Sequence, residues 1–182
     1  LVTAAVQGSD MSAGSEGIVG DINVRALNDN LIDSSVFAGS VALSGAGGFA
    51  LSISGSGATA ANYSRVNVRA AVRDAPTGVT ATGDLSILAD DVSQIDSYVG
   101  AVSVAVSLAL VSAAAAIGSA STDKVIAGTI EAELLRSDVS AGGDVSVLAQ
   151  AGVIADSVTT ARAVAVGTIA MAMGGAASQA NM

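Results

Sequence analysis

Apolar residues recur at every second position over most of this chain, and three of the alternating stretches begin with the same Gly-Asp pair. These stretches are GDINVRA at 20–26, GDLSILA at 83–89 and GDVSVLA at 143–149. A turn signal followed by apolar residues at period two predicts a strand with one buried face. The aspartates of the three pairs are 63 and 60 residues apart, and such a regular spacing predicts an array of structural repeats.

The segments that flank each Gly-Asp pair also repeat, and the run from Thr129 to Gln150 is the clearest copy. It predicts three strands of about five to seven residues, joined by tight turns rich in Asp, Ser and Gly. Short strands separated by little more than a corner are typical of one coil of a β-solenoid. We therefore predict an all-β fold, a β-solenoid (β-helix) fragment with about three repeats of ~60 residues.

We predict a single repeat array over residues 1–182. The blocks divide it into the tail of a truncated repeat at 1–19, repeats at 20–82 and 83–142, and an incomplete repeat at 143–182. The first residues contain neither an initiator Met nor a signal peptide pattern. The chain is therefore expected to be a segment of a longer protein.

Half of each repeat is nearly free of charge, and its secondary structure is open to two interpretations. The runs concerned are 36–62, 98–122 and 163–182. From Ala101 to Leu110, Val and Leu alternate with Ala and Ser, which favours strands. Glycines at 45–48 and at Gly167 favour a bend between two strands.

The alternative is a set of apolar α-helices packed within or alongside the solenoid. The four alanines from Ala113 to Ala116 indicate helix, and the run from Tyr98 to Gly118 would be long enough, as a helix, to cross a bilayer. Against this, each of the many glycines in the first run costs roughly 1 kcal/mol in a helix interior. Strands are therefore the favoured interpretation.

The composition narrows the chemistry that this chain can perform. Of its 182 residues none is Cys, His or Trp, and only two are Phe and two Tyr, so Val, Ile, Leu and Ala must fill the core. The lack of His and Cys removes most metal ligands, nucleophiles and proton shuttles. A net charge of −9 with seven basic residues argues against nucleic acid as a partner. We predict no enzymatic activity and no cofactor.

Two sets of aspartates recur at the repeat spacing: Asp21, Asp84 and Asp144, and Asp33, Asp96 and Asp156. Stacked carboxylates could collect cations, because Ca²⁺ prefers oxygen-rich turns. The other interpretation is that each Asp accepts a hydrogen bond from the backbone of its own turn. One Asp per repeat supplies few ligands, so no metal site is assigned.

The other candidate motifs are interpreted as structural rather than catalytic. Asp90 and Asp91 could form a glycosidase pair only if one had a raised pKa inside a cleft; we predict that they lie on a solvated corner. Residues 45–48 are Gly-rich but lack the Lys-Ser/Thr of a phosphate loop. Arg65, Arg69 and Arg73 lie in an alternating segment, which predicts an outward strand face. No catalytic residue is assigned.

The order of blocks carries a family resemblance. An Ala/Gly/Val-rich run at 99–121 leads to a strand-like run at 125–135 and then to SDVSAGGDVSVLA at 137–149. This order resembles the repeat regions of giant bacterial filamentous surface and secreted adhesins, which include leukotoxin-like and haemagglutinin-like filamentous proteins. The resemblance implies an extracellular or cell-surface location and a long β-solenoid shaft. Asp123-Lys124 departs from the pattern, because such repeats often place an Asn there.

We therefore expect a structural stalk, spacer or adhesive repeat segment of a large bacterial surface or secreted protein. Its expected partners are neighbouring repeats of the parent chain and ligands on host or environmental surfaces, with end-to-end self-association also open. A membrane partner is not expected. Two alternatives remain, a polysaccharide-active β-helix enzyme and a membrane-associated or pore-forming segment.

Overall fold

The computed structural model describes residues 1–15, 19–76 and 78–181. Within these described ranges the chain is all-β, with 84% of the residues in strands and no helix. The strands are β1 (Val2–Gln7), β2 (Met11–Ala13), β3 (Ile22–Gly45), β4 (Phe49–Arg73), β5 (Val79–Ala81), β6 (Leu85–Leu108), β7 (Val111–Leu135), β8 (Val139–Ala141), β9 (Val145–Val166) and β10 (Ile169–Asn181).

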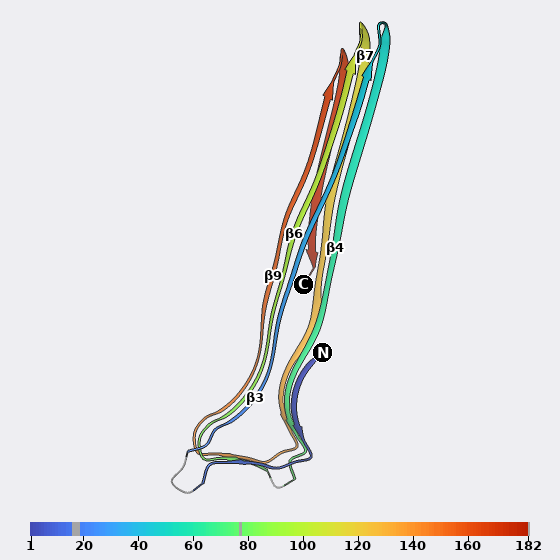
Figure 1. Ribbon diagram of the computed structural model, residues 1–182. Helices are drawn as coiled ribbons and strands as arrows, with labels where there is room; N and C mark the ends of the chain where they lie inside the picture. Colours follow the sequence, from blue (N-terminus) through green and yellow to red (C-terminus); the bar gives the residue numbers. More distant parts are fainter. Residues whose placement is uncertain (16–18, 77, 182) are drawn as a thin grey trace.

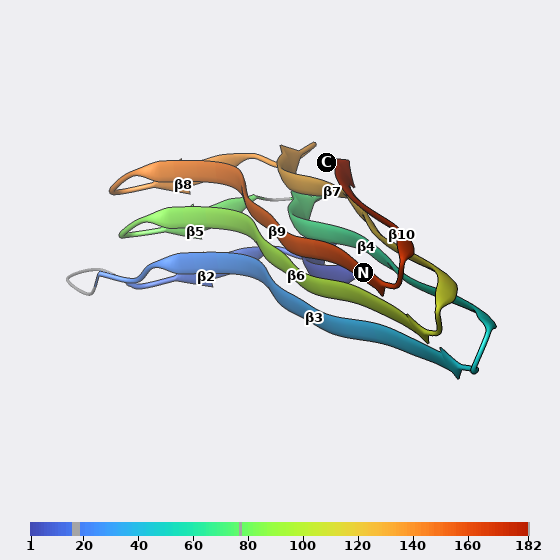
Figure 2. The same ribbon diagram turned by 90° about the horizontal axis from the view of Figure 1, so that it is seen from above.

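Each coil consists of one long strand, a tight turn, a second long strand and a three-residue strand that returns to the start. Equivalent strands stack into three parallel sheets, β3-β6-β9, β1-β4-β7-β10 and β2-β5-β8. Figure 1 shows the two long sheets side by side in a narrow arm, with the short strands closing a base at its lower end. Figure 2 shows the coils stacked one above another. The predicted β-solenoid is confirmed.

The register between coils is continuous along the long strands. Ile22 pairs with Leu85 and Gly45 with Leu108, so all of β3 is matched to β6. β4 is matched to β7 from Phe49 to Arg73 in the same way. Because side chains alternate between the two faces of a strand, this register places equivalent residues of successive coils on the same face.

The three charge-free runs are strands that turn back at the end of the arm, as the alternation predicted. The first coil turns at residues 46–48 and the third at 167–168, where the glycines predicted a bend. In the third coil the Thr168 N–H donates to Ser112 Oγ at 2.8 Å. Ala113 to Ala116 lie within β7, so the helical alternative is wrong for these described residues.

The predicted strand lengths are wrong for the long strands. The charge-free runs do not form a separate hairpin beside short strands; they continue the same strands, which reach 22–25 residues in β3, β4, β6, β7 and β9. The Asp-Ser pairs at 33–34, 96–97 and 156–157 look like boundaries in sequence. They lie within strands because their neighbours supply an unbroken parallel backbone ladder.

The interior changes in character along each coil. In the base it contains large aliphatic side chains, among them Leu85, Ile87, Val68 and Val72, all nearly inaccessible to solvent. In the arm most are small, with Ala58, Ala101 and Ala105 representative of two separate clusters, although the fully buried Val99 belongs to the first. The base is therefore a conventional aliphatic core, and the arm is a thin double sheet. We use "base" and "arm" in this sense, the arm being residues 36–62, 98–122 and 163–181.

Candidate functional site

The Gly-Asp pairs form a structural lock at one corner of the base. The carboxylate Oδ1 of Asp21 accepts the backbone N–H of Asp84 at 2.9 Å, and Oδ1 of Asp84 accepts the N–H of Asp144 at 2.8 Å. A Cβ atom on Gly83 would lie 2.0 Å from Oδ1 of Asp21. Glycine is thus required before Asp84 and Asp144 because the carboxylate of the preceding coil occupies that space.

This finding corrects the prediction that each Asp bonds its own turn. Asp21 and Asp84 accept hydrogen bonds from the backbone of the next coil, which stacks on their own coil in register. Among the described residues, no group of three or more acidic side chains is placed to hold a metal ion. The corner carboxylates have a structural use in fastening adjacent coils.

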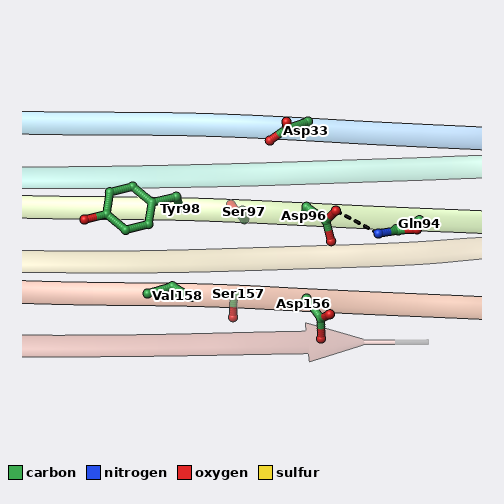
Figure 3. A pocket seen from close by; sticks show the side chains of 8 residues that line it. All are labelled: Asp33, Gln94, Asp96, Ser97, Tyr98, Asp156, Ser157 and Val158. Carbon is green, nitrogen blue, oxygen red and sulfur yellow. Dashed lines mark hydrogen bonds between the residues drawn. The ribbon is translucent and has the colours of Figure 1, made fainter.

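The second aspartate set lies on the outer face of the β3-β6-β9 sheet. Figure 3 shows Asp33, Asp96 and Asp156 in one row on three adjacent strands, with Tyr98 beside them. They line a shallow hollow of about 350 Å³, in which Gln94 Nε2 donates to Asp96 Oδ2 at 2.7 Å. The neighbouring strands that carry these aspartates are about 4.8 Å apart.

The geometry of this hollow does not suit glycoside hydrolysis. That reaction needs two carboxylates on opposite sides of the scissile bond. Asp33, Asp96 and Asp156 instead lie along a single sheet face, so a sugar ring placed on them would have every carboxylate on one side. The prediction that this set lies at turns is also wrong, because all three residues are within strands.

Asp90 and Asp91 lie within β6, so their predicted place on a solvated corner is wrong. Their side chains face opposite sides of the sheet, and Asp91 is buried. Its carboxylate accepts hydrogen bonds from Asn28 Nδ2 at 2.7 Å and from Ser93 Oγ at 3.0 Å. These inward donors explain how a carboxylate is accommodated in the interior without a turn.

A buried lysine is the functional group that sequence reasoning missed. Lys124 is 1% exposed, and its Nζ donates to the backbone oxygen of Ile95 at 3.0 Å. Burial lowers the pKa of Lys124, although Asp156 and Asp96 act in the opposite direction. Lys124 is paired in register with Asn62 of the preceding coil. In the sequence, the replacement of an Asn by Lys124 at the equivalent position of the next repeat was the feature that could have pointed to this residue.

The three arginines lie on the outer face of β4, as predicted. Arg69 and Arg73 both pair with Glu133 of the next coil, with Arg69 Nε 2.6 Å from Glu133 Oε1. Glu131 lies 3.4 Å from Arg69 Nε. These contacts join adjacent coils on the outer surface, beside a hollow of about 200 Å³ that Arg69 and Glu131 help to line.

The end of the arm has an inverted arrangement of polar and apolar side chains. Serines and alanines face inward, where Ser40 Oγ lies 2.7 Å from Ser54 Oγ and Ser44 Oγ donates to Ser107 Oγ at 3.1 Å. Large apolar side chains face outward. We define the apolar tip by the exposed ones: Val41, Leu43, Phe49, Leu51, Ile53, Leu108, Leu110, Val111, Ile117, Val164, Val166, Ile169, Met171 and Met173.

Comparisons with known proteins supply no relative: no family model, no curated protein and no solved structure matches the chain. Within the described ranges, no helix is long and apolar enough to cross a membrane.

Proposed function

We propose that the chain is a structural repeat segment of a large cell-surface or secreted protein, in which its coils stack with further coils of the same kind. The observation that carries this proposal is the continuous register between coils. Every residue of β3 and β4 has a partner in the next coil. At the corner, Asp21 and Asp84 make the same hydrogen bond to the backbone of the next coil, at Asp84 and Asp144. A further coil could therefore form the same contact at the edge of the stack.

The dimensions define the kind of structure that such an array would build. A strand of 24 residues such as β3 spans about 80 Å, whereas each added coil advances the stack by only about 4.8 Å. Many coils would therefore form a tall, thin stack, in which the arms of successive coils make one continuous projecting wall. The extracellular or cell-surface location is supported by the resemblance of the repeat blocks to filamentous adhesins.

A tandem of two copies of this chain tests whether the edges accept another coil. β10 ends beside Val125, while β1 begins at the level of Ile130, because Val2 pairs with Val68 and Val68 with Ile130. The four levels between them would hold the last residue of one copy, the first residue of the next and a two-residue linker. That linker would join β10 and the second β1 into one full-length strand.

We expect the tandem with the two-residue linker to form one stack with a single unfolding transition, at a higher temperature than that of one copy. The matched control has a three-residue linker, which shifts the register by one residue and reverses the faces of the strand. Small-angle scattering and thermal unfolding of both tandems measure the result. Two independent transitions with either linker would contradict the stacking proposal.

A further inference from the structure

We propose that the apolar tip of the arm inserts into one leaflet of a lipid bilayer. This inference goes beyond the structural role and does not depend on it, because it concerns the outer surface of the arm rather than the coil edges. From the sequence, a membrane partner was not expected, and a membrane-associated segment remained only an alternative. The apolar pattern alone does not show that the large side chains of the arm face outward.

The distribution of exposed side chains favours lipid over a protein partner. Apolar residues cover both outer faces of the arm and also its turn, where Leu110 is 84% exposed. A second copy seated flat on one face would leave the other face and the turn in water. A bilayer surrounds an inserted edge on all sides, so it covers both faces and the turn together.

The depth of the apolar tip matches one leaflet. On one face it extends from Val41 to the end of β3 at Gly45, and on the other from Phe49 to the level of Ile117. At about 3.3 Å per residue these lengths are roughly 13–20 Å. Half of a typical hydrocarbon core is about 15 Å.

Polar residues begin where the apolar tip ends. Arg162 is exposed two residues below Val164 on the same face, and Ser119 lies two residues below Ile117 on the other. Asp33, Asp96 and Asp156 lie farther toward the base. From tip to base the outer faces therefore change from apolar residues to a mixed zone that contains Arg162 and the exposed Phe37, and then to the three aspartates.

The interior of the arm suits a low-dielectric surrounding. Several of its serine hydroxyls bond one another or the backbone, as when Ser52 Oγ donates to the Ala42 oxygen at 2.8 Å, while the buried Ser56 hydroxyl has no hydrogen-bond partner among the described residues. The backbone groups of β6 and β7 are paired on both sides. Among the described residues of the arm, the outer edges of β3, β9, β4 and β10 have no neighbouring strand, and unpaired backbone groups are costly in hydrocarbon. This cost favours shallow insertion over a complete crossing.

A single tryptophan reports directly on this proposal, because the chain contains none. In Leu110→Trp the reporter lies at the turn of the arm; in the matched control Leu148→Trp it lies on the outer face of the base, at a residue that is 47% exposed. With vesicles of phosphatidylcholine, we expect the emission of Leu110→Trp to shift to shorter wavelength. Bromine-labelled acyl chains should quench it, while Leu148→Trp should not respond.

A second copy would give a different result. The emission of Leu110→Trp would then shift without vesicles, increasingly with protein concentration, and adding vesicles would change nothing. That outcome overturns the proposal in favour of association between arms. Emission typical of water under all conditions also overturns it, because the tip would then be solvated.

A charge at the turn provides an independent test. Leu110→Asp alters an exposed side chain, so its circular dichroism spectrum should match that of the unmodified chain. Burying an Asp in hydrocarbon is unfavourable enough to weaken vesicle partitioning about 100-fold. Leu148→Asp is the control and should float with vesicles as the unmodified chain does. Equal flotation of both variants would contradict insertion of the tip.

Discussion

The base and the arm are built from the same alternating strands, and the same face of each strand is enclosed along its whole length, yet the residues on that face differ in chemical character. In the base, Ile87 and Val68 face inward while Arg25 and Asp29 face outward among scattered leucines. In the arm, Ala105 and its serine neighbours face inward while valines and leucines face outward. Alternation therefore identifies a strand, but it does not tell which face is enclosed.

The physical reason is the separation of the two long sheets. In the base, the third sheet of short strands holds them apart, and large side chains fill the space. At the end of the arm, turns of two or three residues join them. Sheets that carry large inward side chains pack about 10 Å apart, so sheets joined by so short a turn have room only for Ala, Ser and Gly.

The largest effect is expected from removing volume in the base. Ile87 is 0% exposed and lies on the central strand β6. Ile87→Ala should lower the free energy of unfolding by about 2–5 kcal/mol, because it leaves a cavity. Urea unfolding followed by circular dichroism measures this. Ala105→Gly, the matched deletion in the arm, removes one methyl group and should cost about 1 kcal/mol; equal losses would break the comparison.

The arm should respond instead to added volume. Ala105 is 0% exposed between the two sheets. Ala105→Leu should cost about 1–3 kcal/mol, because the sheets cannot separate without straining the turn. The outward control Val104→Leu should change stability by less than about 0.5 kcal/mol. If Leu at position 105 is tolerated equally well, the arm contains more room than two closely packed sheets allow.

The corner lock should contribute a smaller amount. Asp84→Ala removes the acceptor of the Asp144 N–H and should cost about 1 kcal/mol. Asp33→Ala, on the outer face, should change stability by less than about 0.5 kcal/mol. Thermal unfolding of the two variants compares them, and indistinguishable midpoints would show that the corner carboxylates do not fasten the coils.

A partner substitution sharpens the same test. Gly83→Ala places a methyl group where the Asp21 carboxylate lies, so it should destabilise the chain. Adding Asp21→Ala to that variant should recover part of the loss, because the clash is then removed. A simple sum of the two single effects would contradict this account of the Gly-Asp pair.

The smallest effect at neutral pH is expected at Lys124. Because burial lowers its pKa in the folded chain, the unfolded state binds more protons between that lowered pKa and the usual value of 10.5. Stability should therefore rise as pH increases through this range. Lys124→Met should lack this rise. Urea midpoints measured from neutral to alkaline pH test it, and parallel curves for both chains would show that Lys124 is solvated when folded.

Much of the fold could be predicted from local patterns. The alternation from Ala101 to Leu110, the glycines at 45–48 and the Gly-Asp spacing predicted strands, turns and stacked coils, because these features depend on short-range geometry. Strand length could not be predicted in the same way. Asp33 and Asp91 resemble turn residues, but pairing with β6 keeps Asp33 in a strand, and parallel neighbours on both sides together with the inward donor Asn28 keep Asp91 in one.

By itself, the sequence determined that the chain forms period-two strands in repeats of about 60 residues, that it lacks the side chains of most catalytic and metal chemistry, and that its charge is confined to part of each repeat. Only the tertiary structure decided which face of each strand is enclosed, what the corner aspartates bond and that Lys124 is buried. These depend on the distance between sheets and on the register between coils, which join residues some 60 positions apart.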